Sequence, residues 1–147
     1  ITKTALVNTQ QSVPTGLKDL DDLDECLESA QAVWVPNRNG VLINVAGSFA
    51  ESLQADWIIT GFNREEAATF PDNSQEFLDR VSQSLELSTL QKTQVKSFVA
   101  DLTKKEMVAL AKEHNWPIDL VWSCYFAGDA PCGACESCQR FARALEV

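Results

Sequence analysis

Long apolar runs, basic residues and histidine are all scarce in this sequence. No stretch approaches the ~18 consecutive apolar residues that a membrane-spanning helix needs, and no basic leader with an apolar stretch opens the chain. The 12 basic residues are outnumbered by 21 acidic ones, which gives a net charge of −9. Such a chain is a poor non-specific binder of phosphates or anionic lipid, so neither nucleic acid nor membrane is expected as a partner. The single histidine, His114, falls late in a polar helical pattern, where the helix dipole explains it better than catalysis.

The length and composition are those of a globular protein. Of the 147 residues, 45% are apolar and 22% are charged, which is typical of soluble domains. A chain of this length buries roughly 70% of the surface that its unfolded form exposes. The sequence therefore predicts one domain with a real core, or part of a larger one. Because the chain starts with Ile1 rather than Met, we expect its natural N-terminus to be missing.

Cysteine is present in an odd number, five, which argues against a framework of paired disulfides. Four of the five lie between Cys124 and Cys138, and Cys26 stands alone. With no visible export signal, the expected compartment is the reducing cytoplasm, where clustered cysteines are typical of metal binding. Cys26 is expected to be a small space-filling residue.

Helical and extended patterns alternate along the middle of the chain. Apolar spacing predicts a helix over Val41–Leu53, and the runs Trp57–Thr60 and Val95–Val99 are predicted strands. Helices between short strands indicate an α/β fold with a mainly parallel sheet flanked by helices. The inward face of the first helix is expected to consist of Leu42, Val45, Ala46, Phe49 and Leu53.

Two capping boxes predict where later helices begin: Asn73 with Glu76, and Thr103 with Glu106. We divide the chain into an acidic helical segment at 1–33, an α/β core at 34–120, and a metal-binding loop with a C-terminal helix at 121–147.

The four clustered cysteines have the spacing of metal ligands. Cys132, Cys135 and Cys138 form a C-x-x-C-x-x-C motif, and Cys124 lies eight residues upstream. Two-residue gaps let successive thiolates turn toward one ion, and four thiolates suit one structural zinc ion per chain. An iron–sulfur cluster uses similar ligands and is the second interpretation, ahead of a redox dithiol.

Further motifs share an order and spacing with this cysteine block. They are Val35-Pro36-Asn37-Arg38-Asn39, then Gly61, Phe70-Pro71-Asp72 and Phe77, then Lys104 with Glu106, and finally Ser123-Cys124-Tyr125. From Trp34 to Arg143 the chain resembles the 7-cyano-7-deazaguanine synthases, the nitrile-forming ligases of queuosine and archaeosine precursor biosynthesis.

The resemblance implies a Rossmann-like PP-loop ATP-pyrophosphatase fold and a reaction. ATP, with Mg²⁺, would activate the carboxylate of 7-carboxy-7-deazaguanine as an adenylate. Ammonia would displace AMP to give an amide, and a second ATP would drive dehydration to the nitrile. The resemblance also implies that Arg38 and Asn39 are catalytic. Substrate binding is expected at Asp72, Phe70, Gly61 and Glu66, and a homodimer is possible.

The sequence departs from the family pattern in two places. The family's Ser-Gly-Gly-x-Asp-Ser loop, which holds the pyrophosphate of ATP, is not found here and belongs upstream, so the chain is expected to be a C-terminal portion. The loop Glu66–Ser74 keeps Pro71 and Asp72 but has different polar neighbours. A related ligase for another carboxylate, or a non-catalytic zinc-bearing interaction module, therefore remains an alternative.

Overall fold

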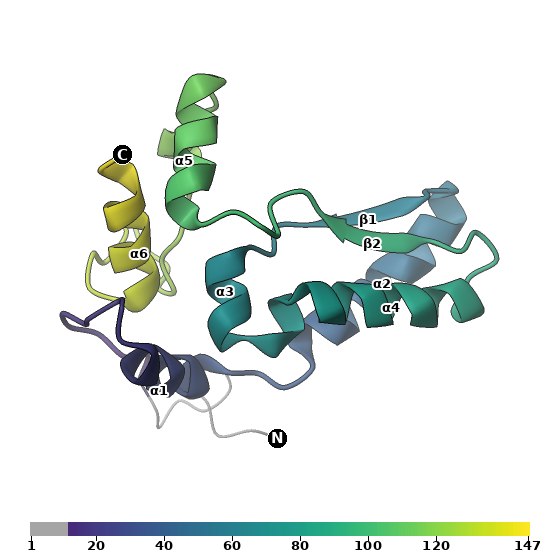
Figure 1. Ribbon diagram of the computed structural model, residues 1–147, viewed down its shortest axis with the longest axis horizontal. Helices are drawn as coiled ribbons and strands as arrows, with labels where there is room; N and C mark the ends of the chain where they lie inside the picture. The colour runs from purple at the N-terminus through teal and green to yellow at the C-terminus, as the bar shows by residue number, and fades with distance from the viewer. Residues whose placement is uncertain (1–11) are drawn as a thin grey trace. The chain divides into compact units, whose positions relative to one another are not determined.

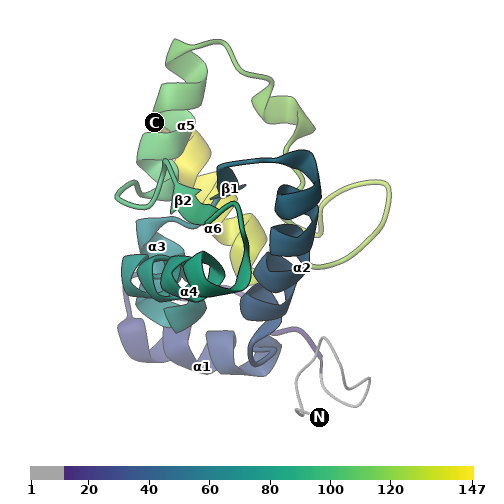
Figure 2. The same cartoon turned by 90° about the vertical axis from the view of Figure 1, so that its right-hand side faces the viewer.

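A computed structural model describes residues 12–147, and its packing separates two compact units. Residues 36–102 form one unit, and the second combines the described residues 12–35 with residues 103–147. The helices and strands of both units are labelled in Figure 1, and Figure 2 shows them from the side. The division of the chain at residues 33 and 120 stays a prediction.

The unit of residues 36–102 is an α/β structure, which confirms the expected fold class. It contains a two-stranded parallel sheet in which Ile58 pairs with Val95. Its elements, in order, are α2 (Arg38–Leu53), β1 (Trp57–Thr60), α3 (Arg64–Thr69), the short 3-10 helix η1 (Pro71–Asn73), α4 (Gln75–Ser88) and β2 (Gln94–Ser97). The second strand therefore begins one residue earlier and ends two residues earlier than predicted.

One apolar core joins the strands of this unit to α2 and α4. Its buried members are Ile43, Leu78, Val81, Leu85 and Val95. Side chains alternate along a strand, so the strand face that carries Ile58 and Val95 packs against the helices. The other strand face carries the half-exposed Trp57, whose ring lies 3.7 Å from Lys96 Nζ.

The helix α2 buries a different face from the one predicted. Leu42, Val45, Phe49 and Leu53 were expected to point inward, but they are 53–75% exposed. The buried face instead consists of Asn39, Gly40, Ile43, Gly47 and Ala50. Small residues allow close approach here, because a Cβ atom at Gly47 would lie 2.8 Å from a methyl carbon of Leu85. The hydrophobic periodicity was right, but the face that it indicated was wrong.

One of the two predicted capping boxes is wrong. The helix α4 begins at Gln75, and Ser74, rather than Asn73, is its N-cap. The hydroxyl of Ser74 accepts a hydrogen bond from Phe77 N at 3.2 Å. Asn73 belongs to the preceding η1 turn, whereas Ser74 has the extended backbone that an N-cap residue requires.

The other unit consists of helices and the cysteine loop. Its elements are α1 (Leu23–Val33), α5 (Lys104–Glu113), the 3-10 helix η2 (Ile118–Leu120) and α6 (Glu136–Leu145). The capping box of Thr103 and Glu106 at the start of α5 is confirmed. The helices α5 and α6 pack together. Among the described residues, no helix combines the length and apolarity needed to cross a membrane.

Truncating Leu78 tests the core assignment. Leu78 is fully buried in α4, so Leu78→Ala is expected to lower the free energy of unfolding by about 2–5 kcal/mol through lost burial and a cavity. Leu87 lies on the same helix but is 91% exposed, so Leu87→Ala should change it by less than about 0.5 kcal/mol. Urea unfolding of both variants measures the difference. Equal losses would contradict the assigned core.

Candidate functional site

The four clustered cysteines form one compact group of sulfur atoms. The sulfurs of Cys124, Cys132, Cys135 and Cys138 all lie within 4.8 Å of one another. The Sγ atoms of Cys132 and Cys138 are 4.0 Å apart. Zinc–sulfur bonds of about 2.3 Å in a tetrahedron place sulfurs about 3.8 Å apart, so this group fits a four-thiolate zinc ion.

The backbone around Cys132 directs the loop toward a common centre. Gly133 has a φ of +68°, a conformation that favours glycine, and it turns the chain between the first two cysteines of the motif. The amides of Ala134 and Cys135 then donate to the sulfur of Cys132 at 3.4 and 3.3 Å. Cys135 is the N-cap of α6 and Cys138 lies in its first turn. The helix thus presents two of the four sulfurs.

The pKa values of the first and last cysteines of this motif, Cys132 and Cys138, are shifted in opposite directions. Hydrogen bonds from the backbone amides of Ala134 and Cys135 lower the pKa of Cys132 to about 6. Burial, followed by a hydrogen bond with Cys135, raises the pKa of Cys138 to about 12. Without metal, Cys132 is therefore a thiolate near neutral pH while Cys138 keeps its proton. A cation that binds all four sulfurs must displace that proton.

Metal affinity is therefore expected to fall as the pH falls. Metal binding should release protons near neutral pH, and the loss of affinity should steepen below about pH 6, where Cys132 is also protonated. Competition with a zinc-chelating dye across this range measures the affinity, and calorimetry in two buffers of different ionisation enthalpy counts the protons. An affinity independent of pH would contradict thiolate ligation.

Two arginines of α6 contact other parts of the same unit. Arg140 pairs with Glu136 at 2.8 Å and donates to the sulfur of Cys26 at 2.9 Å. Arg143 pairs with Asp21 at 2.9 Å. Cys26 is only 5% exposed, as expected for a space-filling residue, and burial raises the pKa of its thiol.

In the other unit, Arg38, Asn39 and Asp72 come together, although 33 residues separate Asn39 from Asp72. Asn39 is buried at the start of α2, and its side-chain amide links the other two. Its Oδ1 accepts a hydrogen bond from Arg38 Nε, and its Nδ2 donates to the backbone carbonyl of Asp72, both at 3.2 Å. Arg38 itself is exposed. We call these three residues the Arg38 cluster.

The carboxylate of Asp72 is held in an unfavourable environment. Burial raises its pKa above the usual 3.8, against the opposing effects of the Arg38 charge and a backbone hydrogen bond from Asn39. The carboxyl group of Asp72 therefore binds its proton more tightly in the folded state than in the unfolded state. The resulting stabilisation is complete below about pH 3.8 and is lost as the pH rises through the folded-state pKa. At neutral pH, the charged Asp72 thus reduces stability.

The remaining expected site residues lie on neighbouring segments. Phe70 is half-buried directly before the η1 turn that contains Asp72, and its carbonyl accepts from Asn73 N at 2.9 Å. Glu66 is half-buried in α3, and Gly61 is exposed directly after β1. The buried Asn63, which N-caps α3 through Glu66 N, was missed by the sequence analysis. Its position three residues before Glu66 was the available signal.

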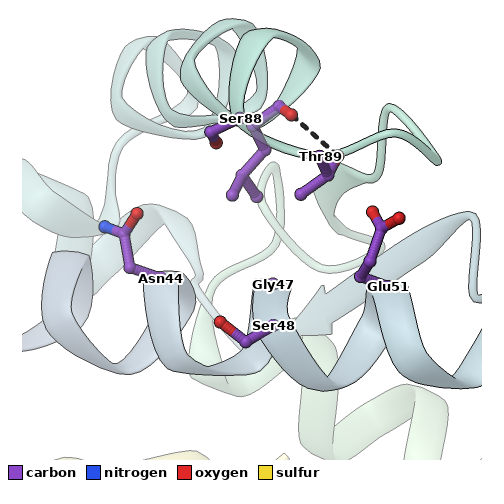
Figure 3. Close-up of a pocket in the computed structure, with 7 residues that line it drawn as sticks. Asn44, Gly47, Ser48, Glu51, Ser88 and Thr89 are labelled. Carbon is purple, nitrogen blue, oxygen red and sulfur yellow. Dashed lines mark hydrogen bonds between the residues drawn. The ribbon is translucent and has the colours of Figure 1, made fainter.

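A cavity of about 490 Å³ lies between α2 and α4 (Figure 3). None of the catalytic, substrate-binding or metal-binding residues expected from the sequence lines this cavity. Its one carboxylate, Glu51, accepts a hydrogen bond from Gln91 N at 3.2 Å. The lining residues are Asn44, Gly47, Ser48, Glu51, Leu85, Ser88 and Thr89.

Comparison with known proteins matches the whole chain to one family. The family model described as "Queuosine biosynthesis protein QueC" matches residues 1–147. A 7-cyano-7-deazaguanine synthase of Carboxydothermus hydrogenoformans is 54% identical over 98% of this chain and 66% of its own length. Proteins of the same name from Pelotomaculum thermopropionicum and Methanosarcina mazei are 50% and 47% identical, over 67% and 65% of their lengths. The chain spans about two thirds of the length of these curated relatives.

Proposed function

Because the chain belongs to the QueC family of queuosine biosynthesis proteins, we propose that it is part of an ATP-dependent ligase that makes 7-cyano-7-deazaguanine. The substrates would be 7-carboxy-7-deazaguanine, ammonia and ATP with Mg²⁺, in the cytoplasm. The observation that carries the proposal is the Arg38 cluster, in which one asparagine bonds to the exposed guanidinium of Arg38 and to the backbone of Asp72, a buried acidic residue. Such a pair suits a ligand that offers both N–H donors and an anionic group.

The reaction requires activation because a carboxylate is a poor electrophile and its oxygen a poor leaving group. ATP would convert the carboxylate to an adenylate, and ammonia would replace AMP to give the amide. A second ATP would then drive dehydration to the nitrile. The protein's part is to orient the reactants and to stabilise the charge that develops at the carbonyl and at phosphorus.

The residues of the cluster have separate roles in this proposal. The carboxylate of Asp72 would accept hydrogen bonds from the N–H edge of the deazapurine. The guanidinium of Arg38 would hold the carboxylate or phosphate in a bidentate way. Asn39 would position both residues, since its side-chain amide bonds to the guanidinium of Arg38 and to the backbone carbonyl of Asp72. Phe70, Gly61 and Glu66 would complete the substrate site, as the resemblance to the family implies.

The four cysteines would hold one structural zinc ion. Their donor set fills all four positions of a tetrahedron, which leaves no place for water or substrate on the metal. The ion would therefore supply fold stability rather than Lewis-acid chemistry.

An assay with a joined protein tests the proposed function. The joined protein would combine this chain with the part of the Carboxydothermus hydrogenoformans relative that lies outside the match. With 7-carboxy-7-deazaguanine, ammonium, ATP and Mg²⁺, it should form the nitrile and AMP, which mass spectrometry detects. Omitting ammonium should stop nitrile formation. A zinc-loaded joined protein that releases AMP only with another carboxylate would favour the related ligase instead.

A further inference from the structure

The segment Thr15–Lys18 pairs with the cysteine loop from the far end of the sequence. Thr15 forms an antiparallel bridge with Cys135, and Gly16 N donates to the carbonyl of Ala134 at 3.1 Å. These contacts join backbone to backbone, and both partner residues, Ala134 and Cys135, lie inside the C-x-x-C-x-x-C motif. The position of the segment thus depends on the conformation of the loop.

The side chain of Gln139 strengthens this junction. Gln139 directly follows the last cysteine, and its Nε2 donates to the carbonyl of Gly16 and, at 2.9 Å, to that of Ala134. Its Oε1 accepts from Lys18 N at 3.3 Å. Both amide hydrogens and one oxygen lone pair are used, so this single side chain bonds to the segment on one side and to the loop on the other.

The helix α6, which carries Gln139, also contacts residues that follow the segment Thr15–Lys18. Arg143 and Arg140 of α6 reach Asp21 and Cys26, which belong to the stretch that follows the segment. The N-terminal end of α6 carries Cys135 and Cys138. A metal ion that fixes these two sulfurs therefore also fixes the helix from which Gln139 bonds to Gly16 and Lys18.

We propose that Gln139 is a positioning residue that transmits metal binding at the four cysteines to the segment Thr15–Lys18. With metal bound, the loop, α6 and the segment form one ordered structure. Without metal, the acceptors at Ala134 and Gln139 lose their fixed positions and the segment is released. This inference rests on the proposed metal centre but goes beyond it, because it assigns the metal an effect on residues that are not its ligands.

Hydrogen–deuterium exchange of the amides of Gly16 and Lys18 tests this coupling, since both amides are donors in the junction. In the whole chain, removal of zinc by a chelator should speed their exchange by about tenfold or more. Gln139→Leu should speed the exchange of Lys18 by a similar factor while the zinc content stays unchanged. The matched control is Gln83→Leu, at an exposed position of α4, which should change neither quantity.

A second variant, Gln139→Glu, keeps the test decisive if Gln139→Leu fails to fold. Gln139→Glu keeps the length of the side chain but sets a carboxylate against two carbonyl oxygens, so it should also release the segment. If the amide of Lys18 exchanged at the wild-type rate in both variants at full zinc content, the role of Gln139 would be overturned. A wild-type chain that binds no zinc would overturn the metal assignment and the coupling together. Faster exchange in Gln139→Leu than in Gln83→Leu would then still support the positioning role, so the two failures are distinguishable.

Discussion

The variant Cys135→Ser is expected to lose its metal ion and, with it, the fixed structure of residues 121–147. Cys135 is fully buried, and its sulfur is one of four within 4.8 Å, so a hydroxyl in its place breaks the donor set. Structural zinc sites contribute an apparent ~10–16 kcal/mol to the folding of small peptides. Whole domains are stable by only ~5–15 kcal/mol, so the loop should not persist without metal.

The lone cysteine provides the matched control for this loss. Cys26 is also buried, but its sulfur bonds to Arg140 and does not belong to the four-sulfur group. Cys26→Ser should therefore keep about one zinc ion per chain, as measured by elemental mass spectrometry. Limited proteolysis should cut Cys135→Ser, but not Cys26→Ser, within residues 121–147. Full zinc content in Cys135→Ser would refute the ligand set, and iron absorption without zinc would identify the other metal.

The four-cysteine group was predictable from sequence because its geometry is local. Two-residue gaps bring thiolates together without help from the rest of the fold, and the structure places all four sulfurs as the spacing indicated. The partner of the loop was not predictable in this way. Nothing near Gly16 or Lys18 in the sequence points to Gln139, because the bonds between them form only in the folded unit.

The inward face of α2 shows a different limit of sequence reasoning. Periodicity identified the helix, since large apolar residues recur at helical spacing. It did not identify the buried face, because close packing against Leu85 selects a small residue such as Gly47 over a large one such as Phe49. Phe49 is instead 64% exposed in the described structure.

The residues of the Arg38 cluster were indicated by sequence motifs, but the contacts between them were not. The resemblance to the family indicated Arg38, Asn39 and Asp72 separately, and the structure adds the amide of Asn39 that joins them. A hydrogen bond across 33 residues depends on how α2 packs near the η1 turn, which no local pattern encodes. The roles of these residues in catalysis stay predictions.

In the joined protein, Asp72→Asn and Arg38→Lys are expected to impair different kinetic constants. If Asp72 accepts the N–H donors of the base, its charged hydrogen bonds contribute about 1.5–3 kcal/mol. An amide would set a donor against a donor, so KM should rise about tenfold or more. Arg38→Lys keeps the charge but loses the planar fork, so kcat should fall more than KM rises. Steady-state kinetics with 7-carboxy-7-deazaguanine measures both.

The thermal stability of Asp72→Asn separates substrate recognition from a purely structural role. Burial raises the pKa of Asp72, so its charge reduces the stability of the fold at neutral pH, and a neutral amide should leave the unfolding temperature unchanged or higher. A residue whose function is to hold the η1 turn would show the reverse, with a lower unfolding temperature and an unaltered KM. Recognition therefore requires that binding weakens while stability does not. An Asp72→Asn protein that unfolds earlier but binds the deazapurine normally would leave Asp72 with a structural role alone.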